Sequence, residues 1–198
     1  DEDFKSIFDR VSESEKNLAQ QWKRHKGTTE EFYKDNKEYL YNLLMFNRTP
    51  EYEVLTRPLM SERGKKILDI GCGIGTVAFM LAQYGNEVVG YDINRACVDF
   101  ANSAAKRNDI KVTFTSSMPD VGQFDLVAAV DTLEHIEDLK GFLIQLGQGM
   151  KPLTRFFHQD CWWTNGLYPM HFDHKESLDQ WLSEAGFRIT SPMWAVKL

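Results

Sequence analysis

The stretch "ILDIGCGIGTVAFML", residues 67–81, constrains the fold of this chain more than any other segment. An apolar run that contains one aspartate leads into glycines at every second position, and apolar residues at helical spacing follow. A strand that passes through such a turn into a helix is the first half of a β-α-β unit. Because glycine has no Cβ, the turn lets the backbone bend sharply and approach a ligand closely. The three glycines are Gly71, Gly73 and Gly75.

Strand and helix patterns alternate from this segment to the C-terminus. The expected strands span 65–70, 87–92, 111–115, 124–130, 154–159, 187–190 and 193–198. This alternation predicts an α/β fold with a Rossmann-like, doubly wound sheet of about seven strands, mainly parallel and covered by helices on both faces. The last two strands are joined by "SP" without a helix between them. We therefore expect an antiparallel pair to close the sheet.

Only helical periodicity occurs before this region. The spacing predicts a short amphipathic helix over 4–11, a second helix that begins at a Thr28–Glu31 capping box and continues through Leu44, and a third over 51–60 bent at Pro58. We interpret residues 1–62 as an N-terminal helical extension and residues 63–198 as the ligand-binding domain.

The composition excludes several classes of protein. A net charge of −6 argues against a nucleic-acid partner, which would require a basic face. No apolar run is long enough for a transmembrane helix, and no signal-peptide pattern opens the chain. Three widely spaced cysteines indicate reduced thiols rather than disulfides or a metal cluster. These features favour a cytoplasmic protein.

The spacing of the glycines separates two kinds of nucleotide ligand. A dinucleotide fingerprint, G-x-G-x-x-G, would need glycine where Thr76 stands. This chain has G-x-G-x-G instead, preceded by Asp69, a carboxylate that would suit an ammonium group. Asp92 ends the next strand, where a carboxylate accepts hydrogen bonds from both ribose hydroxyls. The pattern favours an adenosine that carries a zwitterionic tail.

These segments, "DIGCGIGT", "GYD" and "FDLVAAVDTLEHIED", resemble the consecutive motifs of class I S-adenosylmethionine-dependent methyltransferases. The resemblance runs from about Lys65 to the C-terminus and is greatest to the small-molecule group that includes ubiquinone-biosynthesis enzymes. It implies S-adenosyl-L-methionine as cofactor, with S-adenosyl-L-homocysteine as product. By this resemblance the three glycines line the methionine part with Asp69 at their edge, and Asp92 holds the ribose. It further implies Ile93 on the adenine, Ser117 and Met118 at the adenine edge, and Asp131 near the methionine end.

Two segments depart from the pattern of that family. Many relatives place an aspartate after the third strand, where this chain has Ser116 and Ser117. The turn before the fifth strand usually reads proline-glycine-glycine, but here it reads "KPLTRFF". The first departure leaves the adenine contact to a hydroxyl or to the backbone, and the second carries no functional assignment.

Candidate catalytic residues follow the fourth and fifth strands. His135 and His171 are the candidate general bases, since transfer to a hydroxyl or an ammonium requires that a proton leaves. His135 is equally compatible with bracing its loop. A metal site built from His171, Asp173 and His174 is a weak pattern, because one His-x-x-His with a single acid lacks a second cluster. We expect no metal, and we interpret Asp173 and His174 as the N-terminal cap of the last helix.

Aromatic residues make the candidate acceptor pocket. Trp162, Trp163 and Tyr168 lie in a long loop after the fifth strand, and either tryptophan would suit stacking on an acceptor or plugging the sheet end. Tyr33 and Tyr39 are the residues of the helical extension that we expect to face the acceptor. The extension would then act as a lid that excludes water.

The sequence therefore predicts methyl transfer by in-line displacement to an oxygen or nitrogen of a small-molecule acceptor. The alternative is a catalytically inactive protein that binds S-adenosylmethionine and acts through interaction partners. A nucleic-acid methyltransferase would need a basic groove or an Asn-Pro-Pro-Tyr-like motif, and the sequence has neither. The sequence does not decide the identity of the acceptor or the oligomeric state.

Overall fold

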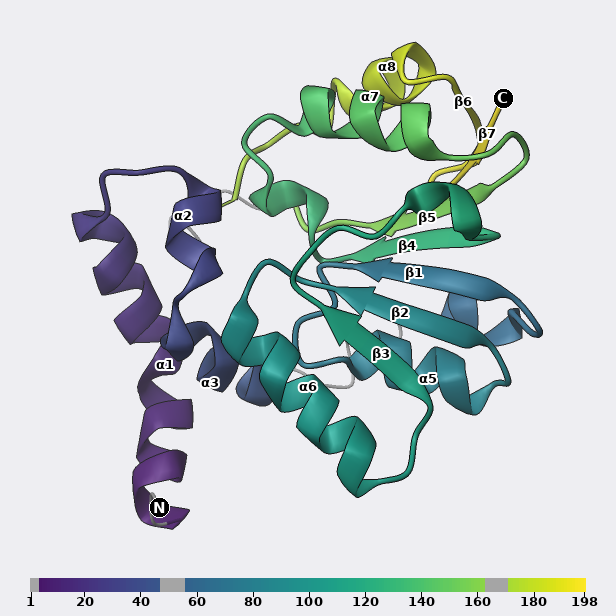
Figure 1. Cartoon of the computed structure of the whole chain (residues 1–198). Helices are drawn as coiled ribbons and strands as arrows, with labels where there is room; N and C mark the ends of the chain where they lie inside the picture. The colour runs from purple at the N-terminus through teal and green to yellow at the C-terminus, as the bar shows by residue number, and fades with distance from the viewer. Residues whose placement is uncertain (1–3, 47–55, 163–170) are drawn as a thin grey trace.

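A computed structural model of the chain describes residues 4–46, 56–162 and 171–198. Its centre is a seven-stranded sheet in the order β3-β2-β1-β4-β5-β7-β6 (Figure 1). The strands are β1 (Lys66–Ile70), β2 (Glu87–Tyr91), β3 (Val112–Thr115), β4 (Leu126–Val130), β5 (Arg155–Gln159), β6 (Phe187–Ser191) and β7 (Trp194–Lys197). β1 to β5 are parallel, and β7 runs antiparallel to both β5 and β6. The predicted fold class is confirmed, including the antiparallel closing pair.

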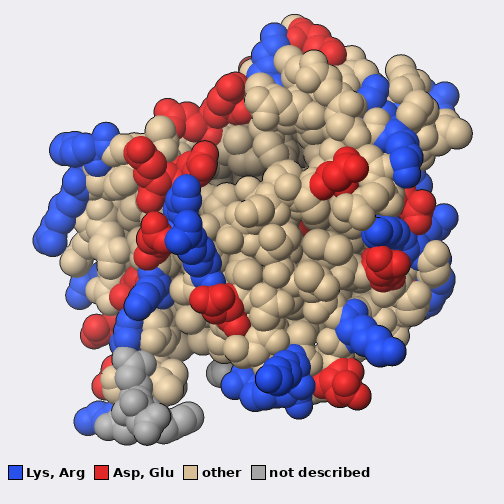
Figure 2. Space-filling model, viewed as in Figure 1, with Lys and Arg blue, Asp and Glu red and all other residues tan. Residues whose placement is uncertain are grey.

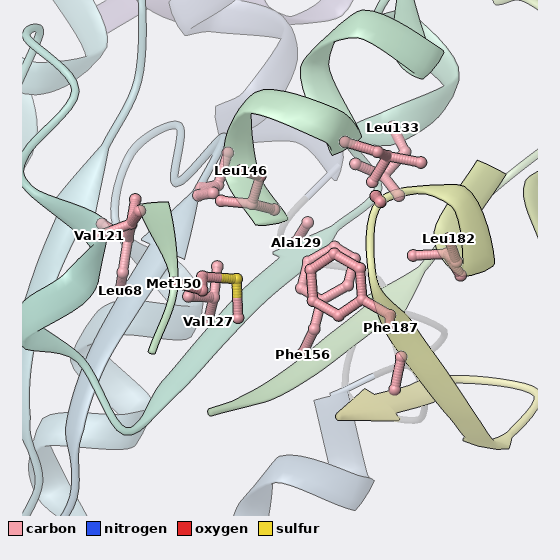
Figure 3. Packing of buried hydrophobic residues seen from close by; sticks show 14 of the residues in the cluster. Leu68, Val121, Val127, Ala129, Leu133, Leu146, Met150, Phe156, Leu182 and Phe187 are labelled. Carbon is pink, nitrogen blue, oxygen red and sulfur yellow. The ribbon is translucent and has the colours of Figure 1, made fainter. Parts of the chain in front are cut away.

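Helices cover both faces of the sheet, because successive side chains of a strand point to opposite sides. Ile67 packs in one core with α5 (Thr76–Gln83) and α6 (Arg95–Arg107). Its neighbour Leu68 packs in the other core, with α7 (Leu139–Gly149) and α8 (Leu178–Glu184). Figure 3 shows this second core, where Phe156 meets Leu182 and Phe187. Each such side chain contributes about 1.5–3 kcal/mol by leaving water, so the two cores fix the strand ends that carry the site.

The N-terminal helices are α1 (Phe4–Arg24), α2 (Thr29–Lys34) and α3 (Lys37–Phe46). Figure 1 shows them grouped at one end of the sheet, beside α6. The expected capping box at the start of α2 is confirmed, because Thr28 accepts from the Glu31 backbone N–H and the Glu31 side chain accepts from that of Thr28. Leu18, Phe32 and Tyr33 form a small core of their own, with Trp22, Tyr39 and Ile93 packed against it.

The expected boundaries of two N-terminal helices were wrong. α1 extends to Arg24 because its apolar face continues through Leu18, although the fully buried Ser14 interrupts the pattern and donates its hydroxyl hydrogen to the Val11 carbonyl. The helix expected from Thr28 to Leu44 is two helices, α2 and α3, with Asn36 between them. The Asn36 side chain accepts a hydrogen bond from the Glu38 backbone N–H at 3.0 Å. A polar side chain that binds the local backbone competes with a continuous helix.

The third expected helix is partly outside the described residues, which resume at residue 56. The segment that follows is a short 3₁₀ helix, η1 (Arg57–Ser61), and Pro58 lies in its first turn rather than at a bend. Among the described residues, no helix combines the length and the apolar character needed to cross a membrane.

Candidate active site

The loop after β1 takes a backbone path that requires glycine. Gly71 has φ 70° and Gly75 has φ 89°, both in the left-handed region that other residues rarely adopt. A Cβ at Gly71 would collide with the Thr132 side chain, and one at Gly75 would lie 2.6 Å from Cζ of Phe114. The backbone N–H groups of Gly71 and Cys72 both donate to the Tyr91 carbonyl, at 2.8 and 3.0 Å. The loop is therefore bound to the end of β2, next to the carboxylate that follows it.

Asp92 connects the glycine loop to the turn after β2. One carboxylate oxygen accepts from the Gly73 N–H and the other from the Asn94 N–H, each at 2.8 Å. Its relative exposure is only 6%, and this burial raises the pKa of its carboxyl, although the two N–H groups oppose the rise. Each oxygen keeps a further lone pair for a ligand. Asp92 thus both shapes the loop and presents an acceptor at the strand end.

Asn94 ties this region to the N-terminal helices. Its side-chain oxygen accepts from the Cys97 N–H at 3.0 Å, which makes it the expected N-cap of α6. Its side-chain nitrogen donates to the Tyr33 carbonyl at 2.6 Å and to the Asn36 carbonyl at 2.9 Å. Because Asn94 is fully buried, these hydrogen bonds hold α2 against the strand end that carries Asp92.

A cavity of about 790 Å³ opens between α2, the strand ends and α7. This volume lies within the range of about 300–1,000 Å³ that is typical of small-ligand sites. Five of its described lining residues are acidic, and none is lysine or arginine. Figure 2 shows that, on the outer surface over the N-terminal helices, acidic side chains are interspersed with lysines and arginines. The five acids are Glu30, Asp92, Asp131, Glu137 and Asp138.

The cavity brings together some of the residues that the sequence singled out. Its lining includes Gly71, Asp92, Ile93 and Asp131, which the sequence assigned to the cofactor, and Tyr33, Tyr39 and His135, which it assigned to the acceptor or to catalysis. Gly73 and Gly75 lie beside it in the same loop, and Gly73 lies against Leu43 of α3. The structure places Ser117 and Met118 on the exposed surface after β3, where Met118 is 41% exposed. Trp162 is half-buried against the α7–α8 core, whereas Trp163 and Tyr168 lie outside the described residues.

Asp69 lies on the opposite face of β1 from the cavity. Its relative exposure is 1%, and it belongs to the side of the sheet that packs against α5. Burial, and then the charge of Asp92, raise the pKa of Asp69 to about 8, while a hydrogen bond from the Ala78 backbone opposes the rise. Ala78 lies in the first turn of α5, whose N-cap Gly75 has no side chain. Asp69 thus supports the helix that begins at the glycine loop.

Tyr33 and His135 line the cavity, and the second candidate histidine, His171, packs against His135. The Tyr33 hydroxyl lies 3.1 Å from Nδ1 of His135. The His135 and His171 rings pack edge to face, with centroids 4.5 Å apart. Burial, then the charges of Glu134, Asp131 and Asp92, raise the pKa of Tyr33 well above its usual value, so its hydroxyl keeps its proton. Tyr33 is therefore a hydrogen-bonding partner for His135 rather than a base.

Acidic residues that the sequence reasoning did not single out lie behind His135. Glu134, in the 3₁₀ turn η3 (Leu133–His135), is fully buried, and its Oε1 accepts from the Cys161 N–H at 3.0 Å. Burial, and then the charge of Asp131, raise the pKa of Glu134. Asp160 lies nearby, and its Oδ2 is 2.7 Å from Nδ1 of His158. The sequence signal was slight, because Glu134 is only one of several separated acids that follow the apolar strand β4 and nothing near Asp160 marks its burial.

Asp131 itself adopts φ 53°, a left-handed conformation that costs energy in any residue other than glycine. It directly follows β4, and its N–H donates to the Gln159 carbonyl at 2.7 Å. Strain of this kind concentrates at functional sites, where the surrounding structure maintains it. This turn redirects the chain after β4, so that the segment with Glu134 and His135 runs along the edge of the cavity.

The segment that carries His171 is bound to this turn. The Phe172 N–H donates to the Glu134 carbonyl at 2.8 Å, and Nε2 of His174 lies 3.1 Å from the Ile136 carbonyl. One ligand atom from each of Glu134, His135 and His171 lies within 4.8 Å of the others, and together they could hold a metal ion. The set considered from sequence was different, since it joined His171 with Asp173 and His174. The expected capping by Asp173 and His174 was wrong as well, because Ser177 is the N-cap residue of α8.

Comparison with known proteins gives the same assignment for the whole domain. A family model described as a methyltransferase domain matches residues 48–191. A ubiquinone biosynthesis O-methyltransferase of Mesorhizobium japonicum is 31% identical over 145 residues, which cover 68% of this chain and 56% of that protein. Another of the same name, from Rickettsia typhi, is 31% identical over 91 residues, which cover 44% and 37%. The chain spans about half the length of the curated relatives it matches, or less.

Solved structures agree on the fold. Magnesium protoporphyrin IX methyltransferase of Synechocystis PCC 6803, solved with bound S-adenosylmethionine, superposes with a TM-score of 0.63 at 22% identity, covering 84% of this chain and 88% of that one. A methyltransferase of Aquifex aeolicus gives 0.62 at 18% identity, covering 75% and 90%. Together with the matched family model, the sheet order and the glycine loop, these findings show that the chain belongs to the class I S-adenosylmethionine-dependent methyltransferases.

Proposed function

We propose that the protein transfers the methyl group of S-adenosylmethionine, by in-line displacement, to an oxygen or nitrogen atom of a small molecule. The observation that carries this proposal is that one cavity joins Gly71 and Asp92 to Tyr33, Tyr39 and His135. A donor held by the first pair would face an acceptor held by the others. The curated relatives are named as O-methyltransferases, which favours oxygen as the acceptor atom.

The residues on the donor side fit the cofactor. When bound, it supplies a methyl group that its positively charged sulfur has already activated. The bare backbone at Gly71 permits close approach of the methionine part, and Asp92 offers its remaining lone pairs to the ribose hydroxyls. Ile93 lines the same wall and would contact the adenine. The acidic lining attracts a donor that carries a sulfonium and an ammonium.

The charge of the cavity also narrows the acceptor. Five acidic residues and no lysine or arginine among the described lining residues would repel a carboxylate or a phosphate. Sequence reasoning alone left phenols, carboxylated molecules and amines open. We infer that the acceptor is neutral or cationic, such as a phenol, an alcohol or an amine.

His135 would accept the proton that leaves the acceptor. A lone pair of the acceptor atom forms the bond to the methyl carbon, the sulfur–carbon bond breaks, and its electron pair stays on sulfur in S-adenosylhomocysteine. The acceptor proton passes to the imidazole of His135, whose Nδ1 faces the Tyr33 hydroxyl, or to the adjacent His171. Such a base contributes about 10²–10⁴-fold to the rate.

Two measurements on the purified chain test the proposal. Calorimetry should detect binding of S-adenosylhomocysteine, and a methyl-transfer assay should show turnover on neutral phenols or amines but little on matched carboxylic acids. Binding without turnover on any acceptor would favour the catalytically inactive alternative. Absence of binding, or turnover confined to the anionic acceptors, would contradict the proposal.

A further inference from the structure

Three carboxylates lie close together at one wall of the cavity: Asp131 lines it, and the side chains of Glu134 and Asp160 are buried behind it. Asp131 and Asp160 both act electrostatically on Glu134, which is fully buried. Among the described residues, no hydrogen-bond donor contacts Oε2 of Glu134 or Oδ1 of Asp160, and the Asp131 carboxyl lies within hydrogen-bonding reach of Glu134. Within the described ranges, no lysine or arginine forms an ion pair with any of the three. Buried carboxylate oxygens without partners are costly, and a bound cation is one way to satisfy them.

Two imidazoles stand beside the carboxylate of Glu134. His135 follows it in η3, and the hydrogen bond from the Phe172 N–H to the Glu134 carbonyl brings His171 to the same point. The three ligand atoms lie within 4.8 Å of one another. Ligand atoms about 2.1 Å from a shared ion lie roughly 3–4 Å from one another. Small side-chain rotations that move these atoms by about 1 Å would therefore bring them to the separations that a bound ion requires.

We propose that Glu134, His135 and His171 bind a divalent first-row transition-metal ion at the wall of the acceptor cavity. Two imidazole nitrogens with one carboxylate suit Mn²⁺, Fe²⁺, Co²⁺ or Zn²⁺. Mg²⁺ and Ca²⁺ prefer sites built from oxygen ligands and should bind more weakly.

The surroundings assign the ligand atoms. Tyr33 engages Nδ1 of His135 at 3.1 Å, which designates Nε2 as the nitrogen for the ion. The Cys161 N–H engages Oε1 of Glu134 at 3.0 Å, which designates Oε2. Metal-binding histidines are commonly oriented in this way by a hydrogen bond at the other ring nitrogen. Tyr33 would therefore act as a positioning residue for the site.

The role of the ion rests on the proposed function and changes the part played by the two histidines. Three protein ligands leave coordination positions for the acceptor oxygen, and binding to a metal lowers the pKa of that hydroxyl. The proton then leaves to solvent instead of to an imidazole. The remainder of the transfer, from the oxygen lone pair to the methyl carbon with the sulfur keeping its electron pair, is unchanged.

Metal binding is measured separately from catalysis. The chain is freed of metal with a chelator and titrated with Mn²⁺ alone, and the free ion is followed by electron paramagnetic resonance. We expect one site. Glu134→Gln and His171→Ala should each abolish it, and Tyr33→Phe should weaken it by about 10–100-fold, as loss of an outer-shell partner does. Asp173→Asn is the matched control, because this exposed carboxylate lies two residues from His171 but outside the group, and its affinity should be unchanged.

The outcomes separate the two proposals. Circular dichroism shows whether each variant folds, and His171→Ala provides the test if Glu134→Gln does not fold, since His171 is only half-buried whereas Glu134 is fully buried. No Mn²⁺ site, or a site that survives His171→Ala, would overturn the metal proposal even if methyl transfer occurs. One site that disappears in these variants would support it even if none of the tested acceptors is methylated.

Discussion

The donor side and the acceptor side of the cavity are built in different ways. The donor side consists mainly of the backbone of the loop from Gly71 to Gly75, together with the carboxylate of Asp92. Both lie within one β-α-β unit. On the acceptor side, Tyr33, Glu134, His135 and His171 come from three segments far apart in the chain, and their hydrogen bonds hold them together. The donor side is therefore a local feature of the sequence, whereas the acceptor side exists only in the folded chain.

The largest expected effect comes from a substitution on the acceptor side alone, which tests whether the two sides act independently. His135→Gln should lower the turnover number by about 10²–10⁴-fold, because it removes the group that accepts the proton or holds the ion. Affinity for S-adenosylhomocysteine should stay within a few-fold, because the donor side is unaltered. Steady-state kinetics and calorimetry on one preparation test both statements, and a parallel loss of cofactor affinity would show that the two sides are not separable.

The reciprocal change acts on the donor side. Asp92→Ala should weaken binding of S-adenosylhomocysteine by about 100-fold, since hydrogen bonds to a charged group contribute about 1.5–3 kcal/mol each. The fold should survive, although the Gly73 and Asn94 N–H groups lose their acceptor. The affinity of Asp92→Asn, which keeps one acceptor oxygen, should lie between those of the wild type and Asp92→Ala. Unchanged affinity by calorimetry in Asp92→Ala would refute the ribose assignment.

A smaller effect is expected where the two sides meet. Asn94→Asp keeps the oxygen that caps α6 but loses the donor to the Tyr33 and Asn36 carbonyls and buries a carboxylate beside them, so it should lower stability by at least about 2 kcal/mol. Amide hydrogen exchange should rise in α2 more than in α6. Asn94→Ala loses the cap as well, and its exchange should rise in both helices. Equal exchange in α2 of the wild type and Asn94→Asp would show that the tether does not hold the helix.

A further effect concerns the pH dependence of stability. The folded-state pKa of Asp69 is raised to about 8, so the folded protein keeps this proton while the unfolded chain has lost it. The unfolded state therefore binds fewer protons between roughly pH 4 and pH 8, and stability falls as pH rises through that window, by at most about 1.4 kcal/mol per pH unit for one group. Asp69→Asn should flatten the fall in denaturant melts. An equal slope in both proteins would show that Asp69 is ionised when folded.

The contrast between the two sides also explains what the sequence could predict. All seven strands and the capping box at Thr28 are written in short-range patterns, and the structure confirms them. The full length of α1 was missed because the buried Ser14 interrupts its apolar stripe. Glu134 and Asp160 were missed because nothing in their local sequence shows that tertiary contacts bury them side by side. Their neighbour His135 was singled out because it follows the fourth strand, not through its environment.

The position of Tyr33 has a consequence for changing which molecules such an enzyme accepts. Its carbonyl is held by Asn94 beside Asp92, and its hydroxyl faces His135. A replacement at this residue that displaces its backbone would also disturb Asn94 beside Asp92, so selectivity and donor binding would then shift together. Phe142 and Gln145 line the same cavity from α7, outside that hydrogen-bonded path, and are the better positions at which to alter substrate range independently.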